Sequence, residues 1–260
     1  MWSRYVALGD SFTEGLMDDV GDDGRHRGWA DRFACALQVA QPDLVYANLA
    51  IRGRLLPQIV EEQVPAAIAL SPDLVSLAAG VNDALRRSYD VHTAMTSLEN
   101  GVSQLRESGA DVLLFAFGDP SRRSAVMGSV RERIAAANAA TKAIASRYDC
   151  FVVDFWGCAA FDGDEMWDED RLHLSPRGHA TATAAALEAL GIGDDAWRTP
   201  TPLEPTGALR RGVGHARWVS RHLAPWVARR IRGQSSGDAI TPKQPTLAPP
   251  RCAPGAVPLS

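Results

Sequence analysis

Several features of common protein classes are missing from this 260-residue sequence. No apolar run approaches the ~18 residues that a membrane span needs, and there is no P-loop, dinucleotide fingerprint or H-E-x-x-H zinc motif. The four cysteines form no C-x-x-C pair and no zinc-like spacing, so we expect buried free thiols. A strand-like run starts at Tyr5, which leaves no room for a signal peptide after Met1, and a cytoplasmic protein is expected.

Charge is divided unevenly along the chain. The formal net charge is −4, but residues 1–199 carry −11 and residues 200–260 carry +7. Between Thr206 and Gly237 there are seven arginines and no acidic residue, and the apolar residues would form one face of a helix kinked at Pro225. We expect this segment to dock on the acidic body or to contact an anionic membrane. Nucleic-acid binding is not expected, because no reading module accompanies the charge.

Short apolar runs alternate with helical patterns through most of the chain. The runs expected to form strands are 5–8, 44–48, 74–78, 112–117 and 151–155. The helical patterns lie at 29–40, 55–69, 91–108, 124–147 and 176–190, and Pro65 should end or kink the second of them. Near-continuous apolar runs are typical of strands that are buried on both faces. The sequence therefore predicts an α/β fold of three layers, α/β/α, with a doubly wound parallel sheet of about five strands.

The composition changes near residue 191. We expect an α/β domain over residues 1–198 and a basic amphipathic extension over 199–233. Residues 234–260 are rich in Pro, Ser and Gly and are expected to be disordered. A G-x-S-x-G motif around Ser235 is interpreted as a chance match, because the nucleophile elbow that this motif marks needs a strand before it and a helix after it.

Residues that could act in catalysis follow the expected strands. Ser11 comes after the first strand, Gly53 after the second and Asn82 after the third. Asp170 and His173 lie in a long acidic loop after the fifth. In an open α/β sheet, ligands bind beyond the carboxyl ends of the strands. We therefore expect these five residues to converge at one edge of the sheet.

Together these residue types can perform nucleophilic catalysis. A serine hydroxyl becomes a good nucleophile when a neighbouring base removes its proton, and His173 can do this for Ser11. Asp170 can reach the Nδ1 proton of His173 round a tight turn and orient the ring. The side-chain amide of Asn82 and the backbone N–H groups of Gly53 and Ser11 can stabilise the oxyanion of a tetrahedral intermediate.

These residues also have structural interpretations. Ser11 could cap a helix, and Gly53 and Asn82 could be turn residues. Other acidic residues compete with Asp170 for the orienting role, namely Asp164, Glu165, Asp168 and Glu169.

Three polar residues near these positions are expected to be structural. Asp10 and Asp83 should tie down their loops by hydrogen bonds, and His179 should be a packed or exposed histidine. His173 and His179 have no third ligand in a recognisable pattern. No metal and no cofactor are therefore expected.

The sequence resembles the SGNH hydrolases, also called GDSL-like lipases and esterases, over about residues 4–190. Residues similar to the four blocks of that family occur in the family's order, at 9–15 (GDSFTEG), 48–53 (NLAIRG), 80–83 (GVND) and 170–173 (DRLH). The resemblance implies a flavodoxin-like three-layer fold. It also implies that Ser11 is the nucleophile, that Gly53 and Asn82 are oxyanion donors, and that His173 is the base with Asp170 behind it.

The activity implied by this resemblance is hydrolysis of a small-molecule carboxylic ester through an acyl-enzyme on Ser11. A thioesterase, a carbohydrate deacetylase or an acyltransferase would use the same groups, and the sequence leaves these alternatives open. A binding or scaffold protein without turnover is a further alternative, which the complete set of catalytic residues disfavours. The sequence also leaves the oligomeric state open.

Overall fold

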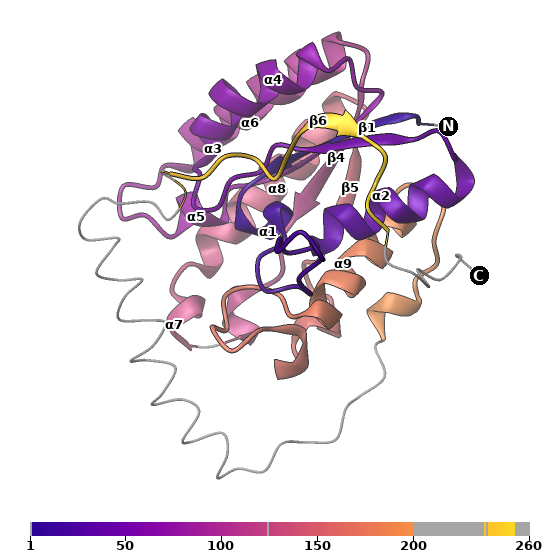
Figure 1. The fold of residues 1–260 in the computed structure, drawn as a ribbon. Coiled ribbons are helices and arrows are strands. Elements are labelled where there is room, and N and C mark those ends of the chain that lie inside the picture. The colour runs from indigo at the N-terminus through magenta and orange to yellow at the C-terminus, as the bar shows by residue number, and fades with distance from the viewer. Residues whose placement is uncertain (1, 124, 200–236, 238, 253–260) are drawn as a thin grey trace.

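A six-stranded sheet forms the centre of the computed structural model, which describes residues 2–123, 125–199, 237 and 239–252 (Figure 1). The strands are β1 (Arg4–Gly9), β2 (Val45–Asn48), β3 (Leu74–Ala78), β4 (Asp111–Ala116), β5 (Phe151–Asp154) and β6 (Gln244–Ala248). Their order in the sheet is β5-β4-β3-β1-β2-β6. Strands β1 to β5 pair in parallel, whereas β6 pairs antiparallel with β2. The parallel part has the doubly wound order of the flavodoxin-like fold, as predicted.

Helices cover both faces of this sheet. The α-helices are α1 (Ser11–Glu14), α2 (Gly28–Ala40), α3 (Leu56–Gln58), α4 (Val64–Ala69), α5 (Val81–Ala84), α6 (Val91–Glu107), α7 (Ala125–Gly128), α8 (Arg131–Arg147) and α9 (Pro176–Ala189). Shorter turns are the π-helix η1 (Ile59–Gln63) and the 3₁₀ turns η2 (Pro120–Arg122), η3 (Ala159–Phe161), η4 (Asp164–Met166) and η5 (Ala196–Arg198). Within the described part of the chain, no helix combines the length and the apolar character needed to cross a membrane.

Burial on both faces explains why the strand sequences are almost entirely apolar. In β1, Tyr5 and Ala7 belong to a core that also contains residues of α2 and α9. Val6 and Leu8 belong to a second core, formed with α3, α4, α6 and α8. Tyr5 packs edge-on against Phe33 of α2, with ring centroids 5.2 Å apart. The predicted three-layer α/β/α arrangement is therefore confirmed.

Pro65 lies inside the helical segment predicted at 55–69, and the helix continues past it. The residues before Pro65 form the π-turn η1, in which Val64 N donates to Ile59 O, five residues earlier. Because proline has no N–H to donate, it fits at the start of a new helical stretch, and here it lies near the start of α4. The predicted interruption is thus a π-turn, and the helix does not end.

The prediction of disorder from residue 234 is wrong for the described C-terminal residues. Strand β6 pairs with β2 and is itself the edge strand of the sheet, and Gln244 Nε2 also donates to Tyr46 O at 2.5 Å. An edge position tolerates Pro245, because a proline there can leave its missing N–H on the unpaired side. The sheet therefore has one strand more than expected. The basic extension and Ser235 fall in residues 200–236, outside the described residues.

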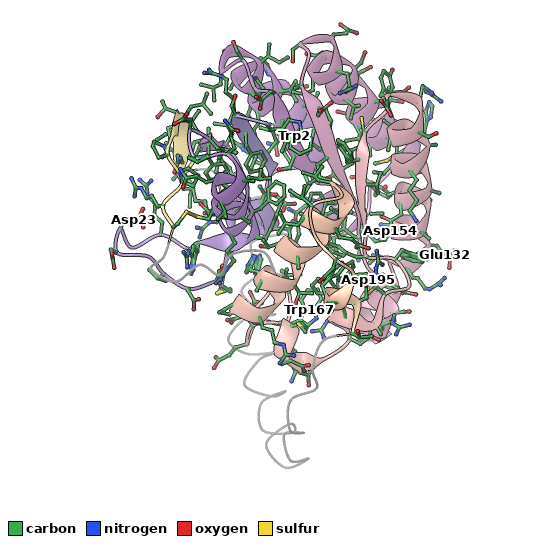
Figure 2. All side chains as sticks on the ribbon, turned by 90° about the vertical axis from the view of Figure 1, so that its right-hand side faces the viewer. Trp2, Asp23, Glu132, Asp154, Trp167 and Asp195 are labelled. Carbon is green, nitrogen blue, oxygen red and sulfur yellow. A yellow bond between two sulfur atoms is a disulfide. The ribbon has the colours of Figure 1, made fainter. Side chains whose placement is uncertain are left out.

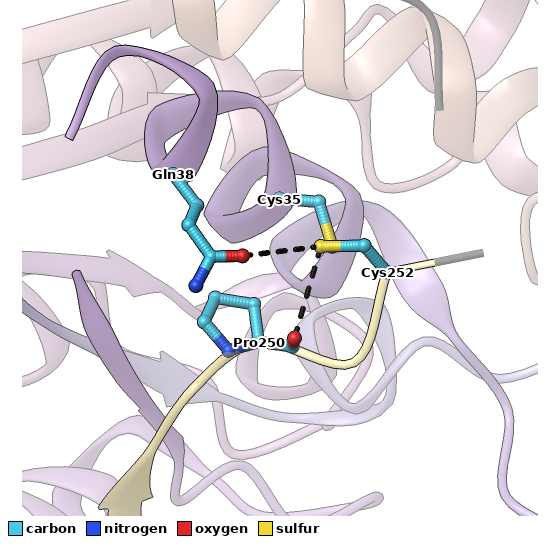
Figure 3. The surroundings of a disulfide bond; sticks show 4 residues. All are labelled: Cys35, Gln38, Pro250 and Cys252. Atoms are coloured by element: carbon cyan, nitrogen blue, oxygen red, sulfur yellow. Dashed lines mark hydrogen bonds between the residues drawn. A yellow bond between two sulfur atoms is a disulfide. The ribbon is translucent and has the colours of Figure 1, made fainter. Parts of the chain in front are cut away.

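The prediction of free thiols is wrong for two of the four cysteines. Cys35 of α2 and Cys252 form a disulfide with a Cα–Cα distance of 5.5 Å, and Figure 3 shows how it joins the C-terminal segment to the helix. Cys150 and Cys158 are free, as predicted. The sequence separation of 217 residues is the reason that spacing gave no signal of this bond, because pairing between distant cysteines depends on the fold.

Candidate active site

The predicted site residues lie at the carboxyl ends of the parallel strands, where the strand order reverses. In the sheet, β1 lies between β2 and β3. From β1 the chain continues to β2 on one side, and from β3 it continues to β4 on the other side. Ser11 follows β1, and Asn82 lies in α5 just after β3. A crevice at such a switch point is where open α/β sheets bind ligands.

The turn that carries Ser11 is fixed by its neighbours. Gly9 has φ +152°, and a Cβ there would lie 2.5 Å from Ala78 O, so only glycine fits between β1 and β3. Asp10 caps α1, because its Oδ1 accepts a hydrogen bond from Phe12 N at 3.0 Å. Ser11 is the first residue of α1, not its cap. Its backbone N–H belongs to the first helical turn, where N–H groups have no partner within the helix.

Asp170, His173 and Ser11 form a continuous chain of hydrogen bonds. Asp170 Oδ2 lies 2.5 Å from His173 Nδ1, and His173 Nε2 lies 3.0 Å from Ser11 Oγ. The partners imply that Nδ1 carries the proton and donates a hydrogen bond to the carboxylate. Nε2 then accepts a hydrogen bond from the serine hydroxyl. Of the acidic residues in this loop, Asp170 is the one that makes this contact with Nδ1.

Asp170 also shapes the loop that carries the histidine. Its Oδ1 accepts hydrogen bonds from Leu172 N and His173 N, both at 2.9 Å. Burial raises the pKa of the Asp170 carboxyl, but the hydrogen bonds and the charge of His173 outweigh burial and hold the pKa below its usual value. The carboxylate is therefore ionised at neutral pH and can stabilise a protonated imidazole.

Backbone contacts on both sides of His173 complete this loop. Asp168 N donates to His173 O at 2.9 Å, and Trp167 forms an isolated antiparallel bridge with Leu174. Ser175 then caps α9, since its side chain accepts from Gly178 N. His173 is thus held between a closed loop and the start of a long helix.

Asn82 is oriented by Asp10, the residue before Ser11. Asn82 Nδ2 donates to Asp10 Oδ2 at 2.9 Å and to Arg54 O at 3.3 Å. Asp83 accepts from Leu56 N at 3.0 Å through Oδ2. The expectation that Asp10 and Asp83 tie down their loops is confirmed. Burial raises the pKa of Asp10 to about 6, although its hydrogen bonds to Phe12 N and Asn82 oppose this shift.

Gly53 lies in a tight turn after β2. Arg54 N bonds to Ile51 O at 3.4 Å, and Gly53 has φ +75°, the left-handed conformation that glycine adopts most readily at this turn position. The turn is tied to α1 by Glu14, whose Oε2 accepts from Arg52 N at 2.8 Å. The Arg52 guanidinium also pairs with this buried carboxylate.

Sequence reasoning missed three polar residues that support these turns. Gln63 is almost fully buried and bonds both polar groups of Gly9: Oε1 accepts from Gly9 N at 2.8 Å and Nε2 donates to Gly9 O at 3.0 Å. Asn48 Nδ2 donates to Thr13 O at 2.9 Å. Lys243 donates to Glu14 O at 2.7 Å. The sequence does carry a signal for Gln63, because a lone glutamine on the apolar face of the 55–69 helix needs hydrogen-bond partners once it is buried.

His179 is a packed histidine, one of the two outcomes expected. Its Nδ1 accepts from Trp29 N at 3.2 Å and its Nε2 donates to Leu16 O at 3.0 Å. Burial lowers the pKa of this imidazole to about 4. Among the described residues, no three His, Cys, Asp or Glu side chains are grouped to hold a metal ion.

Comparisons with known proteins agree with this geometry. The family model of the GDSL-like Lipase/Acylhydrolase family matches residues 7–181, whereas a search of curated proteins gave no significant match. The fold is similar to that of LAE5, an alpha/beta hydrolase enzyme from the metagenome of Lake Arreo, Spain, with a TM-score of 0.62 and 22% identity over 74% of this chain and 97% of that one.

The fold is also similar to that of Axe2, an acetyl xylan esterase from Geobacillus stearothermophilus. A tryptophan variant of Axe2 has a TM-score of 0.61 and 21% identity, over 74% of this chain and 96% of that one. A catalytic mutant of Axe2 with a histidine replaced by alanine has a TM-score of 0.62 and 19% identity, over 74% and 97%. With the family match spanning most of the chain, this protein belongs to the GDSL-like lipase/acylhydrolase family and is an ester hydrolase with the SGNH-type fold.

Proposed function

We propose that this protein hydrolyses carboxylic esters through an acyl-enzyme on Ser11, with His173 as general base and Asp170 as the group that orients it. The hydrogen-bond chain from Asp170 through His173 to Ser11 Oγ, with distances of 2.5 Å and 3.0 Å, is the observation that carries the proposal. Both distances lie within the reach that proton transfer requires.

In the proposed first step, Ser11 Oγ attacks the ester carbonyl carbon while its proton moves to His173 Nε2. The imidazolium that forms is stabilised by the Asp170 carboxylate. When the tetrahedral intermediate collapses, the bond to the leaving alkoxide breaks and His173 returns the proton to it. His173 then takes a proton from water, and the hydroxide attacks the acyl-enzyme carbonyl. When this second tetrahedral intermediate collapses, the bond between the acyl carbon and Ser11 Oγ breaks, His173 returns its proton to Oγ, and the carboxylic acid is released.

The oxyanion of this intermediate is assigned three donors: the backbone N–H groups of Ser11 and Gly53, and Asn82 Nδ2. Removing one such donor typically costs about 3 to 4 kcal/mol of transition-state stabilisation. Support for Asn82 comes from its bond to Asp10, which orients the amide beside the turn that carries Ser11. The second N–H, whose contact with Arg54 O is long at 3.3 Å, would exchange that contact for the oxyanion. Support for Gly53 comes from the Glu14 carboxylate, which joins the Gly53 turn to the helix that Ser11 begins.

The structural neighbours support the choice of these residue types. Three structures of Axe2 are described as catalytic mutants, in which a histidine, an aspartate or a serine is replaced by alanine. Axe2 is described as an acetylxylan esterase, so acetylated xylo-oligosaccharides belong in a substrate panel for this chain. Thioesters and acyl acceptors other than water belong there as well, because the same groups could act on them.

The test combines turnover with covalent labelling of the nucleophile. Aryl esters of increasing acyl length should be hydrolysed, and a fluorophosphonate probe should add one adduct that peptide mapping locates on Ser11. Ser11→Ala should remove both the turnover and the adduct, while Ser235→Ala, in the rival G-x-S-x-G motif, should keep both. Folded wild-type protein that neither turns over an ester nor takes the label would show that the proposal is wrong.

A further inference from the structure

The described residues 239–252 are here called the C-terminal clasp. The clasp begins beside the carboxyl ends of the parallel strands, where the proposed catalytic residues lie, although the family match ends at residue 181. Strand β6 runs antiparallel to β2, and Gln244 at its start is opposite Asn48 at the carboxyl end of β2. In Figure 1, the gold segment that leads to β6 passes α3, and β6 itself lies beside the parallel strands. Lys243, one residue before β6, is therefore placed beside the loops that carry the proposed catalytic groups.

Lys243 is buried in a cage of oxygen atoms. Its Nζ donates to Glu14 O at 2.7 Å and to Arg27 O at 2.8 Å, lies 3.0 Å from His26 O, and is 2.5 Å from the Asp31 carboxylate. Only 10% of its side chain is exposed. A buried ammonium is tolerated only where its charge and its N–H groups are paired, so these contacts hold Lys243 in one position.

The carbonyl groups that Lys243 binds belong to two backbone segments packed tightly together. Glu14 is the last residue of the helix that Ser11 begins, and Arg27 is the residue before α2. A Cβ at Gly15 would lie 2.3 Å from the Cα of Gly28, so the two segments touch through their backbones. Lys243 thus ties the nucleophile turn to the start of α2.

The same turn controls the position of the Gly53 loop. The Glu14 carboxylate binds the N–H and the guanidinium of Arg52, the residue before Gly53. Gly237 lies against the other side of this loop, since a Cβ there would be 2.1 Å from Arg52 O. Contacts from the C-terminal part of the chain therefore reach both the nucleophile turn and the Gly53 turn.

The far end of the clasp is fastened to the body by a covalent bond and an ion pair. Cys252 is joined to Cys35 of α2 (Figure 3). Arg251 pairs at 2.5 Å with Asp23, which Figure 2 labels in the loop that leads from α1 to α2. The disulfide and β6 together keep Lys243 close to its oxygen cage.

We propose that the C-terminal clasp is part of the catalytic apparatus. Lys243 is a positioning residue that holds the Ser11–Glu14 turn and, through Glu14, the backbone at Arg52 and Gly53, and the Cys35–Cys252 disulfide keeps the clasp seated. The proposal rests on the proposed role of Ser11 as nucleophile. Displacing a reacting group by about 1 Å can cost roughly 100-fold in rate, so a clasp that fixes two catalytic turns affects kcat.

The decisive variant is Lys243→Met combined with Asp31→Asn. Methionine keeps most of the side-chain length, and asparagine removes the carboxylate that would otherwise be left buried without its cation. We expect kcat for a soluble aryl ester to fall about 10- to 100-fold with KM changed less than about threefold. Backbone amides of residues 11–16 and 51–54 should exchange hydrogen faster, while circular dichroism stays as in the wild type. Lys142→Met combined with Asp154→Asn, which removes a second Lys–Asp pair on the half-exposed surface of α8 and β5, is the matched control and should change neither readout.

The outcomes separate this proposal from the proposed function. Wild-type kcat together with wild-type amide exchange in the folded double variant would overturn the role of Lys243. If the wild-type protein shows no Ser11-dependent turnover, the proposed function fails, and the exchange measurement still decides whether Lys243 holds the two turns. If the double variant does not fold, Cys252→Ser and dithiothreitol-treated wild type take its place, with the same expected loss. Full activity of the folded, reduced protein would overturn the role of the disulfide.

Discussion

Ser11 Oγ and His173 Nε2 lie 3.0 Å apart, although 162 residues separate them in the sequence. The contact forms because β1 and β5 are parallel strands of one sheet, so the loops that follow them leave from the same edge. Asp170 reaches the other side of the ring from within the same loop as His173. The strand topology thus brings Ser11 and His173 together, and the tight turn from Asp170 to His173 sets the ring orientation.

Asp170→Asn should lower kcat about a thousandfold or more while leaving the fold intact. The asparagine oxygen can still accept from Leu172 N and His173 N, but its amide N–H₂ would face His173 Nδ1. The imidazole would then carry its proton on Nε2, where it cannot accept from Ser11. Steady-state kinetics with an aryl ester measures the loss. Glu169→Gln, in an exposed position next to Asp170, is the control and should keep kcat; equal activity of the two variants would contradict the assignment.

Asp10→Asn should reduce kcat about tenfold, because Asn82 is oriented through the Asp10 carboxylate. An asparagine has one oxygen to offer, so either Phe12 N or Asn82 Nδ2 loses its acceptor. Burial raises the pKa of Asp10 to about 6 and already disfavours its charge, so the neutral replacement should fold.

The control for Asp10→Asn is a second aspartate that caps a helix. Asp90, an exposed residue eight positions after Asn82, caps α6 by accepting from Thr93 N at 2.7 Å. Asp90→Asn should leave kcat unchanged. If both variants keep the kcat of the wild type, the Asp10–Asn82 hydrogen bond has no part in catalysis.

The parallel sheet and the three contacting residues could be predicted because their signals are local. Each parallel strand is a short apolar run, since both of its faces are buried, and the site residues lie in the segments that follow these runs, with Asp170 and His173 at the end of a long loop after the fifth. The D-x-x-H spacing of Asp170 and His173 needs only one tight loop, which sequence shows directly. The turn that contains Gly53 lies next to the turn that carries Ser11 because the strands before them, β2 and β1, are neighbours in the sheet.

The C-terminal part could not be predicted because its structure depends on distant partners. The edge strand β6 contains Pro245 in a proline-rich setting and gains its hydrogen bonds only from β2. Nothing in the sequence marks out Lys243, and the folded chain surrounds it with carbonyl oxygens. Disulfides such as Cys35–Cys252 are rare in cytosolic proteins, so this bond argues against the cytoplasmic location expected from the sequence.

The buried His179 should make the protein sensitive to mild acid. Its pKa is lowered to about 4 by burial, whereas in the unfolded chain the imidazole has the ordinary value of 6.5. Below pH 6.5 the unfolded chain therefore binds more protons, and stability falls until the pH reaches the folded value. The contribution of this one group should fall by roughly 3 kcal/mol between pH 7 and pH 4. Burial is the main cause of the shift, and protonation of Nδ1 would in addition place its new N–H against Trp29 N–H.

Urea unfolding at several pH values measures this effect as a difference between the wild type and His179→Gln. The difference is needed because many carboxylates titrate in the same range. The variant should lose less stability on acidification than the wild type does. His92→Gln, at an exposed position on α6, is the control and should lose as much as the wild type. Parallel curves for the wild type and His179→Gln would contradict the prediction.

Gln63→Leu should destabilise the protein by about 2 to 4 kcal/mol, because leucine has a similar volume but leaves both polar groups of Gly9 without their side-chain partners. Gln104→Leu is the matched control: its amide donates to Asn100 O on the exposed surface of α6, and its replacement should change the free energy of unfolding by less than about 0.5 kcal/mol. Urea unfolding at neutral pH compares the two. A Gln63→Leu variant as stable as the control would show that the Gly9 peptide, and with it the turn carrying Ser11, is held by the sheet alone.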